Sequence, residues 1–336
     1  MPKTPSIPRT PAALGAALMV ATLTPAQAAQ QIEEIVVTSS RVAKPLSTIP
    51  NTVTVINKAE LEQQLAVYND ISTVLGNLIP SFSPSRQKMT NAGETLRGRK
   101  PLYLIDGIPQ SNPLRSGGRD GHTIDPVVIE RVEVLHGANA IHGLGAAGGI
   151  INLITRRPSD ELEQSIRIDT GAQSEDVGES ASYGVSYSVS NTFGNADVIA
   201  SASYRSAGMA YDANGKLIGV DNTQGDTMDS ETFDFFLKAG YNFGDQRIEF
   251  MGNYYDIESN HQWVSVAGDV AADMPTSAEK GELPADGARN EVATFSLSYE
   301  HGNLLGQQLR MQLFRQDFEA TYGAEGTPLA TFQDPA

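Results

Sequence analysis

From Ser165 to Phe318 the sequence alternates between apolar and polar residues, and this period of two constrains the fold more than any other feature. The run 233–243 has an aromatic or aliphatic residue at every second position, and the runs 183–189 and 295–299 repeat the pattern. Successive side chains of a β-strand point to opposite faces, so each run predicts a strand with one apolar face. The second part of the chain is therefore expected to consist of antiparallel strands.

Alternation alone does not separate a soluble β-sandwich from a transmembrane β-barrel. Seven strands are predicted, at residues 163–170, 182–190, 196–205, 232–243, 246–257, 291–300 and 307–318. The connections between them alternate strictly between long and short, which is typical of barrels with long loops at one end and short turns at the other. Aromatic residues near the strand ends fit interfacial girdles, while each taken singly also fits ordinary strand packing: Tyr204, Phe243, Tyr254, Tyr255, Trp263 and Phe318.

Residues 1–28 have the composition of a secretory signal peptide. Lys3 and Arg9 precede the apolar run 12–23, and Ala26 and Ala28 frame a small-residue cleavage site. As a helix, this run is too short to cross a hydrocarbon layer of about 30 Å, which argues against a membrane anchor. Cleavage is expected after Ala28.

A short β-prone segment follows almost directly, within residues 29–45. Its core is Glu33-Glu34-Ile35-Val36-Val37-Thr38-Ser39. A free extended segment of this kind can add to the sheet edge of a partner protein, or it can be an ordinary first strand. The residues alone leave both interpretations open.

Residues 46–160 are expected to form a small α+β domain. Its predicted elements are a strand at 52–56, helices at 58–65 and 70–77, a loop at 81–95, a strand at 102–105 and a second loop at 109–122. Asn57 and Asp70 have the residue types that cap helices, and Pro80 is expected to stop the second helix.

The stretch 130–158 joins this domain to the alternating strands. It predicts two strands, 131–135 and 150–155, around a glycine-rich hinge. The hinge contains a G-x-G-x-x-G pattern at 143–148, which marks a dinucleotide site only when it follows a strand directly and opens a helix. A β-branched run follows it here, so no nucleotide site is expected.

The order of these features resembles the TonB-dependent outer-membrane receptors. The resemblance rests on EEIVVTS, LYLIDGIPQ and IERVEVLHGANAIHGLGAAGGIINLITRRP, where the family typically has an IERVEVLRGP…YG…GGxINxxT pattern. This chain departs from the pattern at His136, Ala138 and His142, where Arg, Pro and Tyr are usual. Within the family, LIDGIPQ and INLITRRP look most like the ferric-siderophore receptors.

The resemblance implies that residues 46–160 are a plug domain and that residues 161–336 are the N-terminal part of the barrel around it. It also implies that Glu33, Glu34, Ile35, Val36, Val37, Thr38 and Ser39 form the TonB box, on which a TonB-type energy transducer pulls from the periplasmic side. The implied function is energy-coupled import of a ferric siderophore across the outer membrane. Iron would arrive inside the ligand, with no resident cofactor or metal site. Because the box follows the cleavage site directly, no N-terminal signalling domain is expected.

Basic and amide side chains in or beside the two loops of this domain are the expected ligand contacts: Arg86, Gln87, Arg99, Arg115 and Arg119. Guanidinium groups can bind an anionic ferric chelate, and amides can bind its oxygens. Each arginine can alternatively be a solvated loop charge or a contact with an acidic barrel wall. Arg97 and Arg131 match plug arginines that, in the family, face barrel glutamates.

Several other functions are disfavoured. The chain has no cysteine and a net charge of −16, with the acidic excess in its C-terminal half, which argues against a thiol enzyme and against nucleic acid as a partner. His122, His136 and His142 lack a metal-binding spacing, and no catalytic constellation is present. A passive barrel or adhesin is an alternative that would need no plug. Cobalamin, haem, another metal chelate or an oligosaccharide is an alternative cargo.

Seven strands are too few for a barrel that encloses a folded plug, because plugged lumens need about 22 strands. Single-chain bacterial barrels also close with an even number of strands. We therefore expect an incomplete curved sheet whose apolar face meets outer-membrane lipid, and we expect the 336-residue chain to be a fragment.

Overall fold

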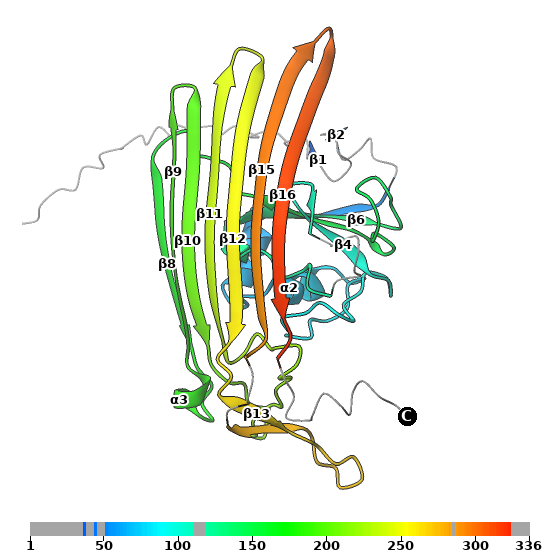
Figure 1. Cartoon of the computed structure of the whole chain (residues 1–336), viewed down its shortest axis with the longest axis vertical. Coiled ribbons are helices and arrows are strands. Elements are labelled where there is room, and N and C mark those ends of the chain that lie inside the picture. The colour runs from blue at the N-terminus through cyan, green and yellow to red at the C-terminus, as the bar shows by residue number, and fades with distance from the viewer. Residues whose placement is uncertain are drawn as a thin grey trace, which may run out of the picture. The chain divides into compact units, whose positions relative to one another are not determined.

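The structure is a computed structural model that describes residues 36–37, 44–45, 51–110, 118–281, 283 and 286–323. A small mixed sheet with two helices is followed by a sheet of seven long antiparallel strands (Figure 1). Among the described residues, no helix has both the length and the apolar character needed to span a membrane. The predicted fold class, a small α+β domain followed by antiparallel barrel-type strands, is confirmed.

The N-terminal domain is built on a five-stranded sheet. Its strands are β3 (Val53–Ile56), β6 (Ile129–His136), β7 (Gly149–Thr155), β4 (Pro101–Ile105) and β5 (Ile108–Pro109), in that spatial order. Only the β4–β7 pair is parallel. Every residue of β4 and β7 is buried, as expected for central strands rich in Val, Ile and Leu. The strands predicted at 52–56, 102–105, 131–135 and 150–155 are all present.

Two helices cover this sheet, α1 (Lys58–Leu65) and α2 (Ile71–Leu78). Asn57 caps α1 in a capping box, with Oδ1 accepting from Glu60 N at 3.0 Å and Glu60 Oε2 accepting from Asn57 N at 3.0 Å. Asp70 caps α2 by accepting from Ser72 N at 3.2 Å and Thr73 N at 2.9 Å. Both predicted helices and both predicted caps are therefore confirmed. The buried helix faces and the inner strand residues form one apolar core.

The glycine-rich hinge allows close backbone packing. A side chain at Gly149, whose φ is +142°, would collide with the carbonyl oxygen of Leu135, and one at Gly148 would collide with that of Arg99. These glycines open strand β7 and not a helix. The G-x-G-x-x-G pattern therefore lacks the helix N-terminus that a dinucleotide needs.

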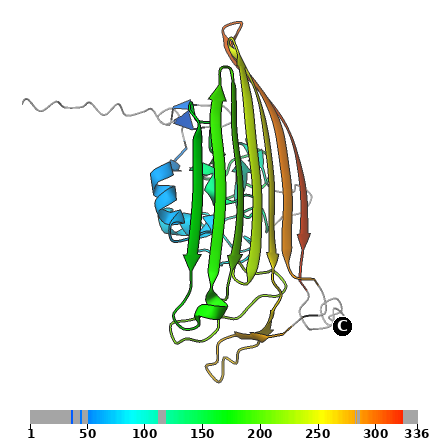
Figure 2. The ribbon, with the colours of Figure 1, turned by 90° about the vertical axis from the view of Figure 1, so that its left-hand side faces the viewer.

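The long sheet has the order β16-β15-β12-β11-β10-β9-β8 (Figure 2). Its strands are β8 (Glu163–Gly171), β9 (Ser182–Phe193), β10 (Ala196–Ala207), β11 (Ser230–Phe243), β12 (Gln246–Ser259), β15 (Arg289–Leu304) and β16 (Gln307–Thr321). All seven predicted strands are present, each somewhat longer than predicted. The sequence did not predict the short helix α3 (Val177–Ser180) or the hairpin of β13 (Trp263–Val266) and β14 (Ser277–Lys280), which lie in long connections.

The two faces of the long sheet differ as the alternation predicts. On β11, Phe233 and Phe235 are 42% and 45% exposed, whereas Asp234 and Phe236, which point to the opposite face, are 1% and 0% exposed. The outward face therefore carries large apolar side chains in the open, which suits contact with hydrocarbon.

The predicted aromatic girdle is only partly correct. Tyr204 and Tyr254 point outward and each contacts another outward ring, at centroid distances of 6.3 Å. Tyr255 faces inward and packs on Met89, because it follows Tyr254 and takes the opposite face. Trp263 is buried beneath the long loops, and Phe318 pairs with the inward residue Val292.

Candidate functional site

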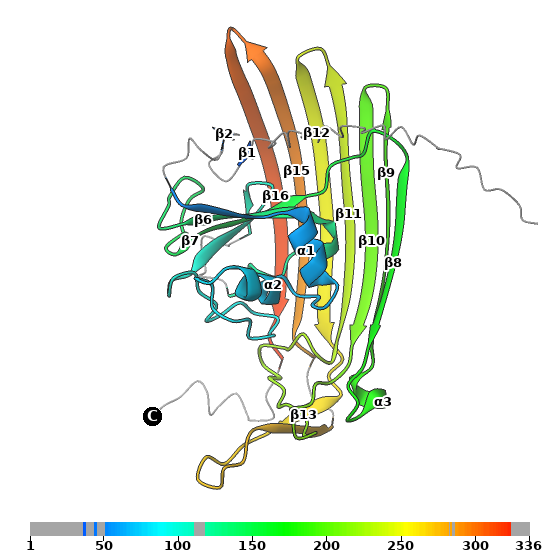
Figure 3. The same ribbon diagram turned by 180° about the vertical axis from the view of Figure 1, so that it is seen from behind.

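The inner face of the long sheet packs against the N-terminal domain (Figure 3). Ile199, Phe236 and Met251 of the sheet join the apolar core of the domain and are at most 5% exposed. A second apolar cluster consists of Met89 of the domain with Tyr255, Ile257 and Ala288 of the sheet and its loops, and the rest of the interface consists of charged and hydrogen-bonded groups. It is the candidate functional site, because any movement of the domain must break these contacts.

A buried ion pair links the domain to β11. Lys238 Nζ lies 2.9 Å from Asp106 Oδ2, which also accepts from Thr155 Oγ1 at 2.6 Å. Asp106 follows β4 in a turn with φ of 48°, and Gly107 completes this turn. Burial opposes ionisation of Asp106, but Lys238 and the Thr155 hydrogen bonds outweigh it and lower the pKa of this carboxyl group. The contact is therefore strongest with Asp106 ionised.

A second polar contact surrounds Asp125, which precedes the 3-10 helix Pro126–Val128 and accepts from Val127 N at 2.8 Å. Its Oδ2 accepts from Ser203 Oγ at 2.8 Å. The Asp125 backbone N–H donates to Asp234 Oδ2 at 3.1 Å. The same carboxyl oxygen accepts from Asn253 Nδ2 at 2.8 Å. Ser203 and Asp234 of the sheet therefore hydrogen-bond this turn of the domain, and Asn253 supports Asp234.

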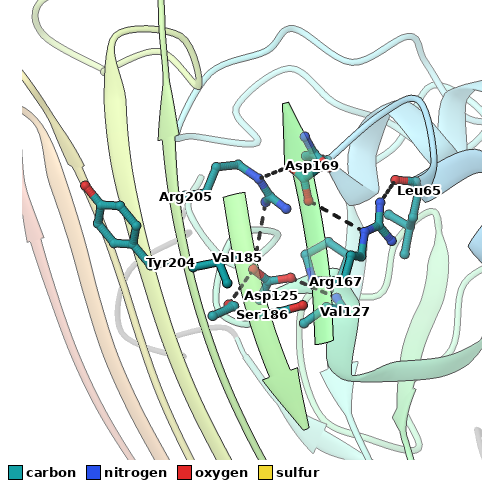
Figure 4. A pocket seen from close by; sticks show the side chains of 12 residues that line it. Leu65, Asp125, Val127, Arg167, Asp169, Val185, Ser186, Tyr204 and Arg205 are labelled. Atoms are coloured by element: carbon teal, nitrogen blue, oxygen red, sulfur yellow. Dashed lines mark hydrogen bonds and ion pairs between the residues drawn. The ribbon is translucent and has the colours of Figure 1, made fainter. Parts of the chain in front are cut away.

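Two arginines of the sheet lie beside Asp125 (Figure 4). Arg205 is 3.8 Å from Asp125 and 3.8 Å from Asp169. Arg167 is 3.6 Å from Asp169 and donates to the Leu65 carbonyl oxygen at the end of α1. The domain thus supplies one carboxylate and one carbonyl to a pair of wall arginines.

At the long-loop end, a sheet loop pairs with the first loop of the domain. Met89 N donates to Gly225 O at 2.9 Å, and Thr227 N donates to Gln87 O at 3.0 Å. Lys88 and Asp226 form an antiparallel bridge and an ion pair between these two bonds. The loop between β10 and β11 is therefore fastened to the domain by backbone hydrogen bonds.

Arg119 lies in the interface and is 2% exposed. Its guanidinium donates to Asn290 Oδ1 and, at 3.3 Å, to the carbonyl oxygens of Arg289 and Gln224. It also lies 4.2 Å from the ring centroid of Tyr322. These contacts place Arg119 against the sheet wall, so we leave it out of the proposed ligand set.

The structure does not bring the other predicted ligand residues into one site. Arg86 and Gln87 are exposed neighbours in the first loop, and Gln87 has a left-handed φ of 54°. Arg99 is exposed on a separate turn beside Gly148. Arg115 lies outside the described residues. Arg86 and Gln87 are thus the predicted contacts that share one described surface.

The two arginines predicted to face barrel glutamates lie in different surroundings. Arg97 is exposed, with φ of 54°. Arg131 donates to Glu133 of its own strand at 2.8 Å and lines a cavity of about 380 Å³ that Glu249 and Glu300 of the sheet also line. Pairing of either arginine with a sheet glutamate stays a prediction.

Of the predicted TonB box, only Val36–Val37 is described, as β1, which pairs antiparallel with β2 (Lys44–Pro45). Glu33, Glu34, Ile35, Thr38 and Ser39 lie outside the described residues.

Beneath the first loop, Glu94 is 2% exposed and accepts from Ser72 Oγ at 2.8 Å. Burial raises the pKa of the Glu94 carboxyl group, although His122 opposes the shift. Within the described residues, no three His, Asp or Glu side chains are grouped to hold a metal ion.

Sequence reasoning missed the contacts made by the inner sheet face. Asp234 and Lys238 stand at polar positions of an alternating strand, where any lumen-facing residue would fit. The sequence nevertheless carried a signal for them. Asp234 and Lys238 are charged, whereas the other inward positions near the centre of this strand are small or apolar.

Comparison with known proteins agrees with the fold. Residues 45–150 match the TonB-dependent receptor plug domain. The rhizobactin receptor of Rhizobium meliloti (strain 1021) is 34% identical over 85% of this chain and 39% of its own length. The ferric aerobactin receptor of Klebsiella pneumoniae is 28% identical over 89% of this chain and 42% of its own length. The chain thus spans about two fifths of these relatives.

Solved structures share the arrangement at low sequence identity, which bears on the fold alone. The siderophore receptor PirA from Pseudomonas aeruginosa superposes with a TM-score of 0.54 at 20% identity, over 81% of this chain and 43% of that one. The ferripyoverdine receptor of the same organism gives 0.57 at 18% identity, over 85% and 37%. Residues 45–150 are therefore a TonB-dependent receptor plug domain, and with seven strands of a partial barrel after it the chain is similar to the TonB-dependent receptors, a family of outer-membrane proteins.

Proposed function

We propose that the receptor represented by this chain binds a ferric siderophore at its long-loop end and imports it when a TonB-type transducer displaces the plug. The observation that carries the proposal is similarity over most of the chain to receptors named for rhizobactin and for ferric aerobactin. This similarity extends through the plug into the strands and loops, where ligand specificity is expected.

The surface of the first plug loop supports an anionic ligand. Arg86 is exposed there beside Gln87, and the nearby backbone is held by the pairing with residues 224–227. A guanidinium on a fixed loop binds carboxylate or other anionic oxygens with charge-assisted hydrogen bonds. Arg86 and Gln87 are accordingly the proposed plug contacts of the chelate, and Arg99 and Arg115 are proposed as further contacts.

The plug–sheet interface supports displacement under force. Most of its contacts are ion pairs and hydrogen bonds, which water can replace at modest net cost once they are exposed. Apolar wall side chains add to them in two clusters. A pull on the segment 33–39 would reach β3 first, because the chain runs from this segment into the edge strand of the plug sheet.

Cobalamin is the second candidate cargo. The vitamin B12 transporter BtuB of Vibrio vulnificus is 29% identical over 70% of this chain. That similarity covers less of the chain at lower identity than the rhizobactin receptor does. The siderophore class is therefore preferred.

The test is binding and uptake by the full-length receptor in outer membranes, with radioiron-labelled ferric aerobactin, iron-loaded rhizobactin and cyanocobalamin as probes. We expect saturable binding of at least one ferric chelate and none of cyanocobalamin. Arg86→Gln should weaken binding of the chelate by roughly tenfold, the loss expected for one charge-assisted contact. Binding of cyanocobalamin in place of both chelates would overturn the assignment of cargo.

A further inference from the structure

A chain of three cavities runs along the inner face of the long sheet from β8 to β12, between the sheet and the helix-bearing side of the plug. The cavity nearer the long loops has a volume of about 240 Å³ and is lined by Gln87 and Ser230, among others. A second cavity, of about 260 Å³, is lined by Ser165, Ser188 and Ser201, which are cross-strand neighbours. A constriction of only about 10 Å³ lies between them.

The three cavities form one seam, because their linings overlap. The constriction shares Asp125 and Arg205 with the first cavity. It shares Arg167 and Ser186 with the second. The groups that close the seam are therefore the two wall arginines and the plug carboxylate drawn in Figure 4.

The charges at this closure come from different parts of the molecule. Arg167, Arg205 and Asp169 belong to the wall, whereas Asp125 and the Leu65 carbonyl belong to the plug. With the plug in place, two cations face two carboxylates. Without Asp125, Arg167 and Arg205 are left to share one ion-pair partner, Asp169.

Arg205 is held loosely enough to exchange partners. Arg205 reaches Asp125 and Asp169 only at 3.8 Å, outside hydrogen-bond distance. By contrast, Arg247 near the short turns donates two hydrogen bonds to the carboxylate of Asp197, at 2.6 and 2.9 Å. A carboxylate that approached Arg205 in good geometry would form a stronger contact than Asp125 does.

We propose that Arg167 and Arg205 form an anion-binding site in the barrel wall, which Asp125 of the plug occupies at rest and a carboxylate or similar anionic group of the cargo takes when the plug moves. The inference rests on the proposed function and adds a site below the loops. Cavities of 240 and 260 Å³ are too small for a whole chelate, so the site acts only after the plug has shifted. The serine-lined cavity beyond the closure offers hydroxyls to an oxygen-rich ligand.

The binding test needs no transport. Full-length receptor in outer-membrane vesicles is treated with phenylglyoxal, which modifies free guanidinium groups, and modified residues are located by mass spectrometry. We expect Asp125→Ala to make Arg205 react several times faster than in the unaltered protein, and acetate to protect it by replacing the lost carboxylate. Arg247, whose partners Asp197, Asn242 and Glu249 all belong to the sheet, should react alike in both proteins and is the matched control.

Asp125→Asn tests the role of charge while keeping an acceptor oxygen for Val127 N, with its amide nitrogen able to donate to Ser203 Oγ, and it keeps the proposal falsifiable if the alanine variant does not fold. Faster modification of Arg205 with protection by acetate supports the site. If acetate does not slow the modification of Arg205 in either variant, the proposal is overturned, and these contacts only hold the plug against the sheet.

The transport test uses radioiron-labelled ferric aerobactin. Arg205→Gln should leave surface binding within twofold and lower the uptake rate by roughly tenfold, with Arg205→Lys in between, since one cationic contact is lost on the path and not at the entry. Normal uptake by Arg205→Gln overturns the proposal. If the unaltered receptor neither binds nor imports any ferric chelate, the proposed function fails, and the phenylglyoxal result still decides whether the wall site binds anions.

Discussion

Lys238 of the barrel wall and Asp106 of the plug meet at 2.9 Å inside the molecule, with side chains only 5% and 17% exposed. Thr155 of β7 donates to the same carboxylate from the backbone and from its hydroxyl group, at 3.0 and 2.6 Å. A single carboxylate therefore joins the end of β4, the end of β7 and the middle of β11.

Replacing Lys238 with methionine should weaken the seating of the plug by about 3 kcal/mol, because it leaves a buried carboxylate without its cation. The measurement is hydrogen exchange by mass spectrometry at peptides covering 101–105 and 149–155 in the full-length receptor. Lys280→Met is the matched control, since Lys280 pairs with Glu179 at a site where it is 63% exposed, and should change the exchange little. Equal exchange in the two variants would contradict the prediction.

The stability of the plug should fall as the pH rises above the ordinary pKa of a glutamate, because of Glu94. Burial raises the pKa of Glu94 in the folded plug above its ordinary value of 4.5. At pH values between 4.5 and the raised pKa, the folded state therefore binds more protons than the unfolded state. Stability is therefore lost through this window as the proton leaves.

Glu94→Gln should remove this part of the pH dependence and stabilise the plug at neutral pH. Hydrogen exchange of residues 90–96 measured as a function of pH is the test. The pKa of Asp106 is lowered in the folded state, so its contribution to stability has the opposite sign and is lost as the pH falls below the ordinary value of 3.8. The effects of Glu94 and Asp106 therefore occupy separate pH ranges. An unaltered pH profile in Glu94→Gln would assign the dependence to other groups.

Gly149→Ala should prevent correct folding of the plug or destabilise it by about 3 kcal/mol or more, since both a positive φ and a collision with the Leu135 carbonyl oppose a side chain there. Gly171→Ala is the control, because a side chain at Gly171 meets nothing within 4 Å. Protease resistance and heat-modifiable migration of the two variants in outer membranes give the comparison. Similar resistance would show that the hinge backbone can move aside.

Val37→Pro should abolish uptake of the ferric chelate while leaving its binding intact, because proline removes the backbone donor that an added strand needs. Val37→Thr keeps the donor and the β-propensity and should transport normally. Full uptake by the proline variant would show that the segment 33–39 is not the TonB box.

The sequence predicted the elements well because their causes are local. Asn57 and Asp70 cap helices wherever a helix follows them, and alternation along 233–243 imposes two faces on a strand whatever the neighbouring strands are. Arg119 illustrates the limit. Its position in a loop leaves ligand contact, a solvated charge and contact with the barrel wall open, and only the structure shows that it is buried against Asn290, which lies 171 residues later on the long sheet.

The closure of the seam was equally beyond local reasoning. Arg205 and Asp125 are each ordinary in their own segments, and only the register of β8 with β9 and β10 brings Arg167, Asp169 and Arg205 to one place beside the plug. Tyr255 was misassigned for the opposite reason, because an aromatic residue near a strand end was treated without regard to the face it occupies.

The pairing between residues 87–90 and 224–227 has a consequence for how such receptors diversify. Its hydrogen bonds at Met89 and Thr227 join main-chain atoms, so they persist whatever side chain stands at 86 or 87. Gly225 is the exception, because a side chain there would collide with Met89 and Ala288. Saturation mutagenesis should accordingly find position 86 tolerant for assembly and position 225 intolerant, whereas the left-handed φ of 54° at position 87 disfavours β-branched residues there. Natural variation can then alter the chemistry offered to a ligand on a loop whose anchorage does not depend on that chemistry.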